Sequence, residues 1–171
     1  MNVRWNQAML TLLGGGPEFL EPSSMPIPEE LSRLLTAGFE EKGECILLRS
    51  LASTRTSALD YLQAKDDETG IEATINEIHV EDFVPAQVPL FELARLGCDF
   101  GFVLAKKLAD ERPSGSFRVI VAAMAAEPSS GNLRDYCTVR FHKRREGAAW
   151  LNDDLEAYRE EAIKVLDIQI A

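Results

Sequence analysis

The sequence predicts a single α+β domain in which a mainly antiparallel sheet of about four strands packs on helices, one of them central and apolar. The chain has 171 residues, a length typical of one domain, and 46% of its residues are hydrophobic. Residues 89–111 show the strongest helical periodicity, whereas 117–126 and 135–144 show strand patterns with only a turn between them. Because consecutive strands joined by a short connection pair antiparallel, α+β is favoured over a doubly wound fold.

The N-terminal region begins with a short helical pattern. Residues 4–13 carry apolar side chains at helical spacing, and Gly14 is a natural end for that helix. Residues 17–28 contain four prolines and are expected to form a loop. We therefore expect residues 1–171 to form one domain, with residues 1–16 as a candidate N-terminal helical arm.

A second helix and a first strand are expected next. Pro28 suits the first turn of a helix, and the acidic residues that follow it suit the positive helix end. This helix is expected to bury apolar residues from Leu31 to Phe39 and to end near Gly43. Residues 45–48 form a short apolar run bounded by turn residues, which is typical of a buried strand.

Two short helices are predicted in the middle of the chain. Ser57 suits the cap of a helix that extends through Ala64. From Glu68 to Ile78, isoleucines recur at spacings of four and three, which is again a helical pattern. The acidic side chains of this second segment would then lie on solvent-exposed faces.

The central helix is predicted over residues 89–111 and is apolar on more than half of its circumference. Gly97 and Gly101 are four residues apart, which lets another backbone approach this helix closely. Pro113 and Gly115 end the pattern.

The two strongest strand patterns differ in character. Residues 117–126 are apolar with few charges, which is typical of a central strand. Residues 135–144 alternate, as a half-buried strand does. The apolar face carries Cys137, Val139 and Phe141, and the polar face carries Tyr136, Thr138, Arg140, His142 and Arg144.

The C-terminal region is expected to end in a strand. Asn152 or Asp153 suits the cap of a short helical turn through Tyr158. Residues 162–170 are mostly β-branched and predict the terminal strand.

The charge of the chain is acidic and uneven. With 28 acids and 18 bases, the net charge is −10. Residues 1–99 contain 17 acids and 7 bases, whereas residues 100–171 contain 11 of each. An acidic surface repels nucleic acid and anionic lipid and attracts basic partners. The longest apolar run, 119–126, is far shorter than the roughly 18 residues of a membrane span. We therefore expect a basic protein partner, no nucleic acid and no membrane.

One segment concentrates the negative charge. Residues 66–82 contain seven acids and neither Lys nor Arg. These are the candidate partner-binding residues: Asp66, Asp67, Glu68, Glu72, Glu77, Glu81 and Asp82. The alternative is that the segment is only a solvated face.

The polar face of 135–144 suggests a second kind of site. Arg140, His142 and Arg144 are candidate anion-binding residues. Aromatic and basic side chains also alternate on sheets that bind nucleic acid, but no RNP-type motif is present and the net charge opposes such binding. The alternative is that these bases pair with the acids of the chain itself.

Motifs for catalysis and metal binding are missing from the sequence. It contains neither a GxSxG elbow nor a P-loop nor an HExxH motif. Cys137 and His142 are five residues apart, so on one strand they point to opposite faces. His79 and Glu81 share a face in extended chain, but no third ligand follows at a suitable spacing. The sequence therefore predicts no catalytic residue, no metal site and no cofactor.

The cysteine pattern indicates the compartment. The three cysteines, Cys45, Cys98 and Cys137, form neither an even set nor a CxxC pair. Reduced, buried thiols are expected, and the N-terminus shows no export signal. Both observations favour a cytoplasmic location.

Three functions are consistent with these patterns. The first is a non-catalytic acidic binding protein; in broad character it resembles immunity proteins, which neutralise basic bacterial toxins. The second is a structural or assembly subunit that forms a homo-oligomer. The third is a small-ligand-binding domain or enzyme with a dispersed site.

Overall fold

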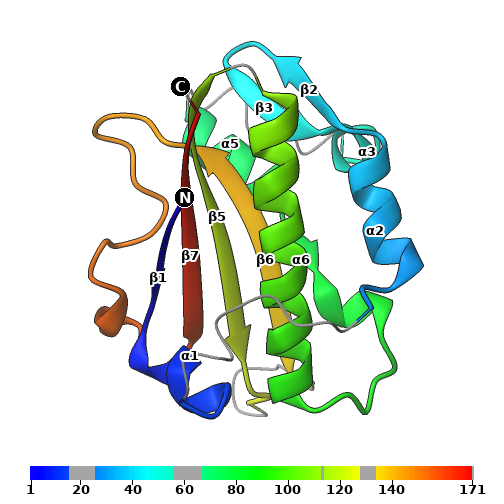
Figure 1. Ribbon diagram of the computed structural model, residues 1–171, viewed down its shortest axis with the longest axis vertical. Helices are drawn as coiled ribbons and strands as arrows, with labels where there is room; N and C mark the ends of the chain where they lie inside the picture. The colour runs from blue at the N-terminus through cyan, green and yellow to red at the C-terminus, as the bar shows by residue number, and fades with distance from the viewer. Residues whose placement is uncertain (16–25, 56–66, 113, 128–133, 171) are drawn as a thin grey trace.

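The predicted α+β class is confirmed by a computed structural model, which describes residues 1–15, 26–55, 67–112, 114–127 and 134–170 (Figure 1). One antiparallel sheet has five strands in the order β1-β7-β5-β6-β4, and a separate hairpin pairs β2 with β3. The strands are β1 (Asn2–Trp5), β2 (Phe39–Lys42), β3 (Cys45–Leu48), β4 (Ile78–His79), β5 (Gly115–Met124), β6 (Tyr136–Lys143) and β7 (Ala162–Ile170). The helices are α1 (Gln7–Leu12), α2 (Glu29–Thr36), α3 (Arg49–Ala52), α5 (Glu68–Ile75) and α6 (Leu90–Glu111), with 3₁₀ turns η2 (Val80–Phe83) and η4 (Leu155–Ala157).

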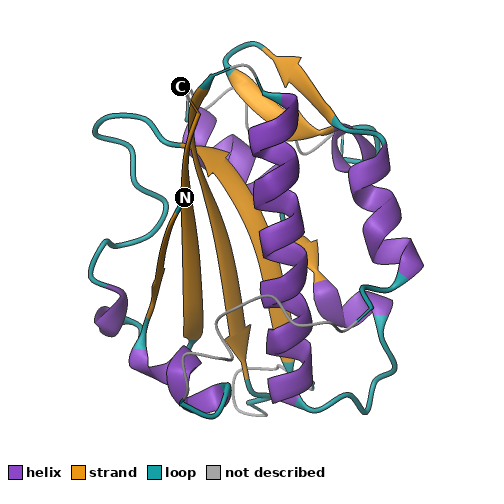
Figure 2. Cartoon of the chain, viewed as in Figure 1, coloured by secondary structure: helices purple, strands orange, loops and turns teal. Residues whose placement is uncertain are grey.

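The long helix α6 crosses one face of the sheet, as Figures 1 and 2 show. Its two glycines allow the close approach that the sequence predicts. A Cβ atom at Gly97 would lie 2.4 Å from the Cys137 sulfur, and one at Gly101 would lie 2.8 Å from a Val121 methyl carbon. Both distances are shorter than a Cβ atom tolerates, so the glycines set the distance between helix and sheet.

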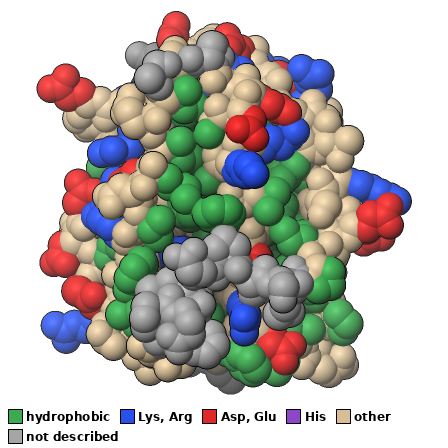
Figure 3. Space-filling model, in the orientation of Figure 1, with side chains coloured by type: hydrophobic (Ala, Val, Ile, Leu, Met, Phe, Trp, Pro, Cys, Tyr) green, Lys and Arg blue, Asp and Glu red, His purple; other side chains and the backbone are tan. Residues whose placement is uncertain are grey.

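The outward side of α6 is partly apolar. Phe91 and Val103 are among its exposed side chains. Apolar and charged side chains are interspersed on this face of the molecule (Figure 3).

The second face of the sheet is covered as well, which corrects the prediction of a half-buried strand over 135–144. Apolar side chains of β5 and β7 pack there against Leu151, Leu155 and Tyr158. Thr138 and His142, predicted to be on the polar face, are only 3% and 2% exposed. The segment that follows β6 returns over this face, a long-range contact that an alternating pattern does not reveal.

Helix α5 joins the hairpin to the main sheet through a buried amide. Asn76 follows α5 and is fully buried. Its Oδ1 accepts a hydrogen bond from the Leu48 amide at 2.8 Å, and its Nδ2 donates to the carbonyl oxygens of Ile46 and Phe141 at 2.9 and 3.2 Å. The edges of β3 and β6 are thus connected by a side chain instead of a strand.

Several element predictions are wrong at their boundaries. The helix expected to bury Phe39 and to end near Gly43 ends at Thr36, because Gly38 has a φ of 69° and turns the chain into β2. Trp5 lies in β1, because it pairs with Lys164 of β7. The helix expected through Ile78 ends at Ile75, and Ile78 pairs with Val139 of β6.

The longer elements and the short strand β3 agree with the sequence. Helix α6 and strands β3, β5, β6 and β7 lie within a few residues of the predicted ranges, and β5 and β6 form the predicted antiparallel pair. The short turn η4 is capped by Asp154, the residue after the predicted cap. The helix predicted over 57–64 lies outside the described residues.

Candidate functional site

A row of polar and charged side chains crosses the second face of the sheet at one end. His142 of β6 pairs in register with Arg118 of β5, which pairs with Asp167 of β7. Arg118 donates two hydrogen bonds to Asp167, from Nε to Oδ1 at 2.7 Å and from Nη2 to Oδ2 at 3.1 Å. All three side chains are buried. Such a bidentate pair fixes the guanidinium geometry.

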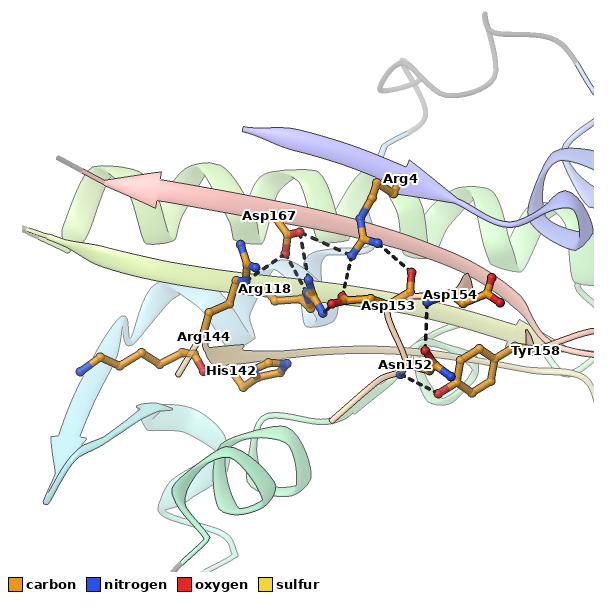
Figure 4. A network of polar contacts seen from close by, with 10 residues as sticks. Arg4, Arg118, His142, Arg144, Asn152, Asp153, Asp154, Tyr158 and Asp167 are labelled. Atoms are coloured by element: carbon orange, nitrogen blue, oxygen red, sulfur yellow. Dashed lines mark hydrogen bonds and ion pairs between the residues drawn. The ribbon is translucent and has the colours of Figure 1, made fainter. Parts of the chain in front are cut away.

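A pocket of about 260 Å³ lies against this row. We call it the arginine pocket; its lining residues are Arg118, His142, Arg144, Arg145, Gly147, Ala148, Ala149 and Asp153. Figure 4 shows that Arg118 and His142 come from neighbouring strands, whereas Arg144 directly follows β6 and Asp153 comes from the segment after it. The small side chains at 147–149 leave room between that segment and the sheet.

Two of the pocket arginines are already paired. Arg118 contacts Asp153 at 3.1 Å in addition to Asp167. Arg145 donates to both oxygens of Glu72, at 2.7 and 3.1 Å. These guanidinium groups therefore have their charges balanced within the protein.

Arg144 differs from Arg118 and Arg145 because its side chain is only weakly paired with a carboxylate. Its side chain is 45% exposed, and among the described residues its one ion pair is to Asp167, with 3.9 Å between Nε and Oδ1. Its backbone, by contrast, is fixed by a hydrogen bond to the Ser116 carbonyl. Arg144 is therefore a cation that the fold anchors at the pocket and leaves available to a ligand.

The imidazole of His142 has one satisfied nitrogen. Nδ1 lies 2.9 Å from the Lys143 carbonyl oxygen. Nε2 is buried and has no hydrogen-bond partner within the part of the chain that the structure describes. Burial lowers the pKa of His142, and the cations of Arg118 and Arg145 lower it further, although the Lys143 carbonyl and Glu72 act in the opposite direction. The ring is therefore neutral at physiological pH.

The structure brings together two of the three residues predicted to bind an anion. Arg140 shares the face of His142, but it pairs with Glu77 and lies 5.7 Å from the centre of the Trp150 ring. It does not line the arginine pocket.

Sequence reasoning missed Arg118, Arg145, Asp153 and Asp167 as members of the site. Arg118 interrupts an otherwise apolar strand pattern, and Asp167 lies with Lys164 and Gln169 in a mostly apolar one. A charge inside a buried strand is rarely tolerated without a partner, so this interruption is the signal that could have found them.

The acidic segment does not form one exposed surface. Glu72 is fully buried, and Glu81 is 7% exposed. The sequence-based expectation that both carboxylates face solvent is therefore wrong. Their oxygens accept backbone hydrogen bonds, Glu72 from Ile46 and Lys143 and Glu81 from Cys137.

The remaining acids of the segment have mixed surroundings. Glu77 pairs with Arg140, and Asp82 pairs with Arg134. Asp67 caps α5 by accepting a hydrogen bond from the Gly70 amide at 2.9 Å. Glu68 is partly buried, and Asp66 lies outside the described residues.

His79 and Glu81 form an ion pair at the edge of the sheet. The distance from His79 Nδ1 to Glu81 Oε1 is 2.9 Å. This hydrogen bond raises the pKa of His79 above its ordinary 6.5, against the opposing effect of burial. Burial raises the pKa of Glu81, but the hydrogen bonds from His79 and the Cys137 amide outweigh it, so the pKa is lowered.

We expect a pH-dependent contribution of His79 to stability. Because its pKa is raised on folding, the contribution is fully present below 6.5 and is lost as the pH rises through the folded-state pKa. Chemical denaturation of the wild type and His79→Gln should differ by roughly 0.2–1 kcal/mol near pH 5.5, and less near pH 8.5. The opposite shift of His142 is common to both proteins and cancels. A difference that grows with pH would contradict this assignment.

The cysteines are free and buried, as expected. Burial raises the pKa of Cys45 and of Cys98 to about 11, which disfavours the thiolate. Cys137 packs in the core beneath α6, whereas His142 lines the pocket on the other face. The prediction that these two residues point to opposite faces is confirmed.

Two kinds of site are absent from the described residues. No group of three or more His, Cys, Asp or Glu side chains in these ranges is arranged to hold a metal ion. No helix in the described part of the chain is long and apolar enough to cross a membrane.

Comparisons with other proteins identify a family and no individual relative. No curated protein and no solved structure matches the chain. A family model matches residues 4–170, which include every residue of the arginine pocket. The chain therefore belongs to the Uncharacterized protein PM0498 family.

Proposed function

We propose that this protein binds a small oxyanion in the arginine pocket. The observation that carries the proposal is Arg144, an anchored cation whose nearest carboxylate oxygen is 3.9 Å away. A guanidinium group offers several N–H donors in a fork that matches carboxylate and phosphate oxygens.

The charge balance of the site supports the proposal. Three arginines (Arg118, Arg144 and Arg145) line the pocket together with one carboxylate, Asp153. Asp167 and Glu72 balance the charges of Arg118 and Arg145. Among the described residues Arg144 has one ion pair, the 3.9 Å contact with Asp167, and its partial burial strengthens its attraction for an anion.

Arg144→Gln tests this function. Isothermal titration calorimetry with inorganic phosphate should show binding to the wild type that is weakened roughly ten- to hundredfold in the variant, because a charge-assisted hydrogen bond contributes about 1.5–3 kcal/mol.

Arg33→Gln is the matched control. Arg33 is an exposed arginine of α2 that pairs with Glu29, and it does not line the pocket. Equal losses in the two variants would indicate nonspecific charge attraction and would refute the proposed site. A wild type that binds no anion would refute it as well.

Binding of a basic protein in the cytoplasm is a second proposal. It is supported by the net charge of −10, which would accelerate association with a cationic partner in a salt-sensitive manner. Because Glu72 and Glu81 are buried, such a partner would respond to the overall field rather than to the segment 66–82. An immunity-type role and assembly into a homo-oligomer stay predictions.

A further inference from the structure

We propose that the arginine pocket selects an oxyanion that carries its own hydrogen, hydrogen phosphate above all, and rejects sulfate. This inference rests on the proposed function and adds a specificity-determining residue, His142. The pocket arginines recognise negative charge; His142 would recognise a proton on the ligand.

The tautomer of His142 follows from its surroundings. The Lys143 carbonyl oxygen, 2.9 Å from Nδ1, only accepts hydrogen bonds. Nδ1 must therefore carry the ring hydrogen. In a neutral imidazole the other nitrogen, Nε2, then has a lone pair and no hydrogen, and it acts as an acceptor.

The charged groups around the ring keep it neutral. Glu72 faces it from α5, Arg118 from β5 and Arg145 from the residues after β6. Asp167 and Asp153 are bound to Arg118 and offset part of its charge. Since burial and the two arginines outweigh the Lys143 carbonyl and Glu72, the pKa of His142 is lowered and protonation at Nε2 is disfavoured.

An unpartnered buried acceptor discriminates between ligands. Nε2 of His142 is buried without a hydrogen-bond partner among the described residues, in a side chain that is 2% exposed and lines the pocket. A ligand hydroxyl directed at Nε2 would donate a hydrogen bond to it. An anionic oxygen without a hydrogen would instead be repelled by the lone pair of Nε2. Sites built on such a polar group reject ligands that lack the matching hydrogen.

Phosphate and sulfate are tetrahedral oxyanions that differ in this hydrogen. At neutral pH inorganic phosphate carries at least one O–H group, whereas sulfate carries none. We therefore assign the O–H group to His142 Nε2 and the charged oxygens to Arg144. A phosphate monoester has a second pKa near 6, so it carries the required hydrogen mainly below that pH.

The test compares three probes at constant ionic strength. Calorimetric titration near pH 7.5 should give a dissociation constant for inorganic phosphate at least about tenfold lower than for sulfate. Methyl phosphate should bind more tightly near pH 5.5 than near pH 7.5, because it carries the required hydrogen mainly at the lower pH. Tighter binding at the higher pH would contradict selection by the hydrogen.

His142→Phe removes the acceptor and keeps a ring of similar size. The ratio of the two dissociation constants should then fall toward one. Nitrogen NMR of the wild-type imidazole provides a second readout that does not depend on the variant folding. The signal of Nε2 should show a bare acceptor in the free protein, and it should shift on addition of phosphate and remain unchanged with sulfate.

The outcomes separate the two proposals. Equal binding of phosphate and sulfate, or a hydrogen on Nε2 in the free protein, would overturn the selection by His142 and leave anion binding intact. Absence of binding for both anions would overturn the proposed function, and this inference with it.

Discussion

Replacing Glu72 by glutamine should lower the free energy of unfolding by roughly 3–5 kcal/mol, because it breaks a buried ion pair and leaves one charge uncompensated. Glu72 is fully buried and lies against Arg145. Its Oε1 accepts from the Ile46 amide and Arg145 Nη2, and its Oε2 accepts from the Lys143 amide and Arg145 Nη1. Urea denaturation measures the loss.

Glutamine cannot replace this carboxylate in either orientation. Each oxygen of Glu72 accepts one backbone and one guanidinium hydrogen bond. An amide NH₂ group at either position would point a donor at two donors. The four bonds connect β3, α5, the end of β6 and Arg145 just after it, so the hairpin should loosen from the main sheet.

Glu68→Gln is the matched control, one helical turn earlier on α5. Glu68 is partly buried in the first turn of the helix, where its charge contributes at most about 1 kcal/mol. Glu72→Lys, which places a cation against Arg145, should prevent folding altogether. A loss below about 1 kcal/mol in Glu72→Gln would contradict the buried ion pair and indicate that Glu72 faces solvent, as the sequence suggested.

The burial of Glu72 shows why the acidic segment was misread. Seven acids without a local base are typical of a solvated or partner-binding face. The groups that Glu72 binds are 26 residues away at Ile46, 71 at Lys143 and 73 at Arg145. Local charge pattern contains no information on partners at such separations.

The same difference between local pattern and remote contacts explains which helices and strands could be predicted. Helix α6 and strands β5, β6 and β7 have 8 to 22 residues, enough for a period to be read. Strands β1 and β4 have four and two residues and form because the remote strands β7 and β6 pair with them. Strand β2 has four residues and forms because Gly38 turns the chain so that it can pair with β3. Periodicity over so few residues fits a helix equally well.

The candidate site was predicted only in part for a related reason. His142 and Arg144 could be placed on one face by alternation within a single strand. Arg118 and Asp167 join them only when β5 is known to lie between β6 and β7. Arg140 fits the same alternation, but a carboxylate from another element, Glu77, neutralises it.

Phe141→Ala should lower the free energy of unfolding by roughly 3–5 kcal/mol, because it leaves a cavity in a packed core. The side chain of Phe141 is fully buried beneath α6. Its ring packs edge-to-face on Phe39, with ring centres 5.5 Å apart and planes at 86°. Such pairs contribute about 0.5–1.5 kcal/mol beyond the area they bury, so Phe39→Ala and Phe141→Ala should be coupled in a double-mutant cycle.

Ile120→Ala tests whether the opposite face of the same sheet is equally closed. Ile120 lies next to Arg140 in the β5–β6 register and is 3% exposed in the cluster with Leu151 and Leu155. Its truncation should cost roughly 2–5 kcal/mol, close to the cost of Phe141→Ala. Thr138→Ala, which removes a small buried hydroxyl hydrogen-bonded to Arg140, should cost about 0.5–1.5 kcal/mol. A small loss in Ile120→Ala beside a large one in Phe141→Ala would mean that the segment after β6 does not cover the sheet in solution. The arginine pocket, which that segment closes, would then lose its outer wall.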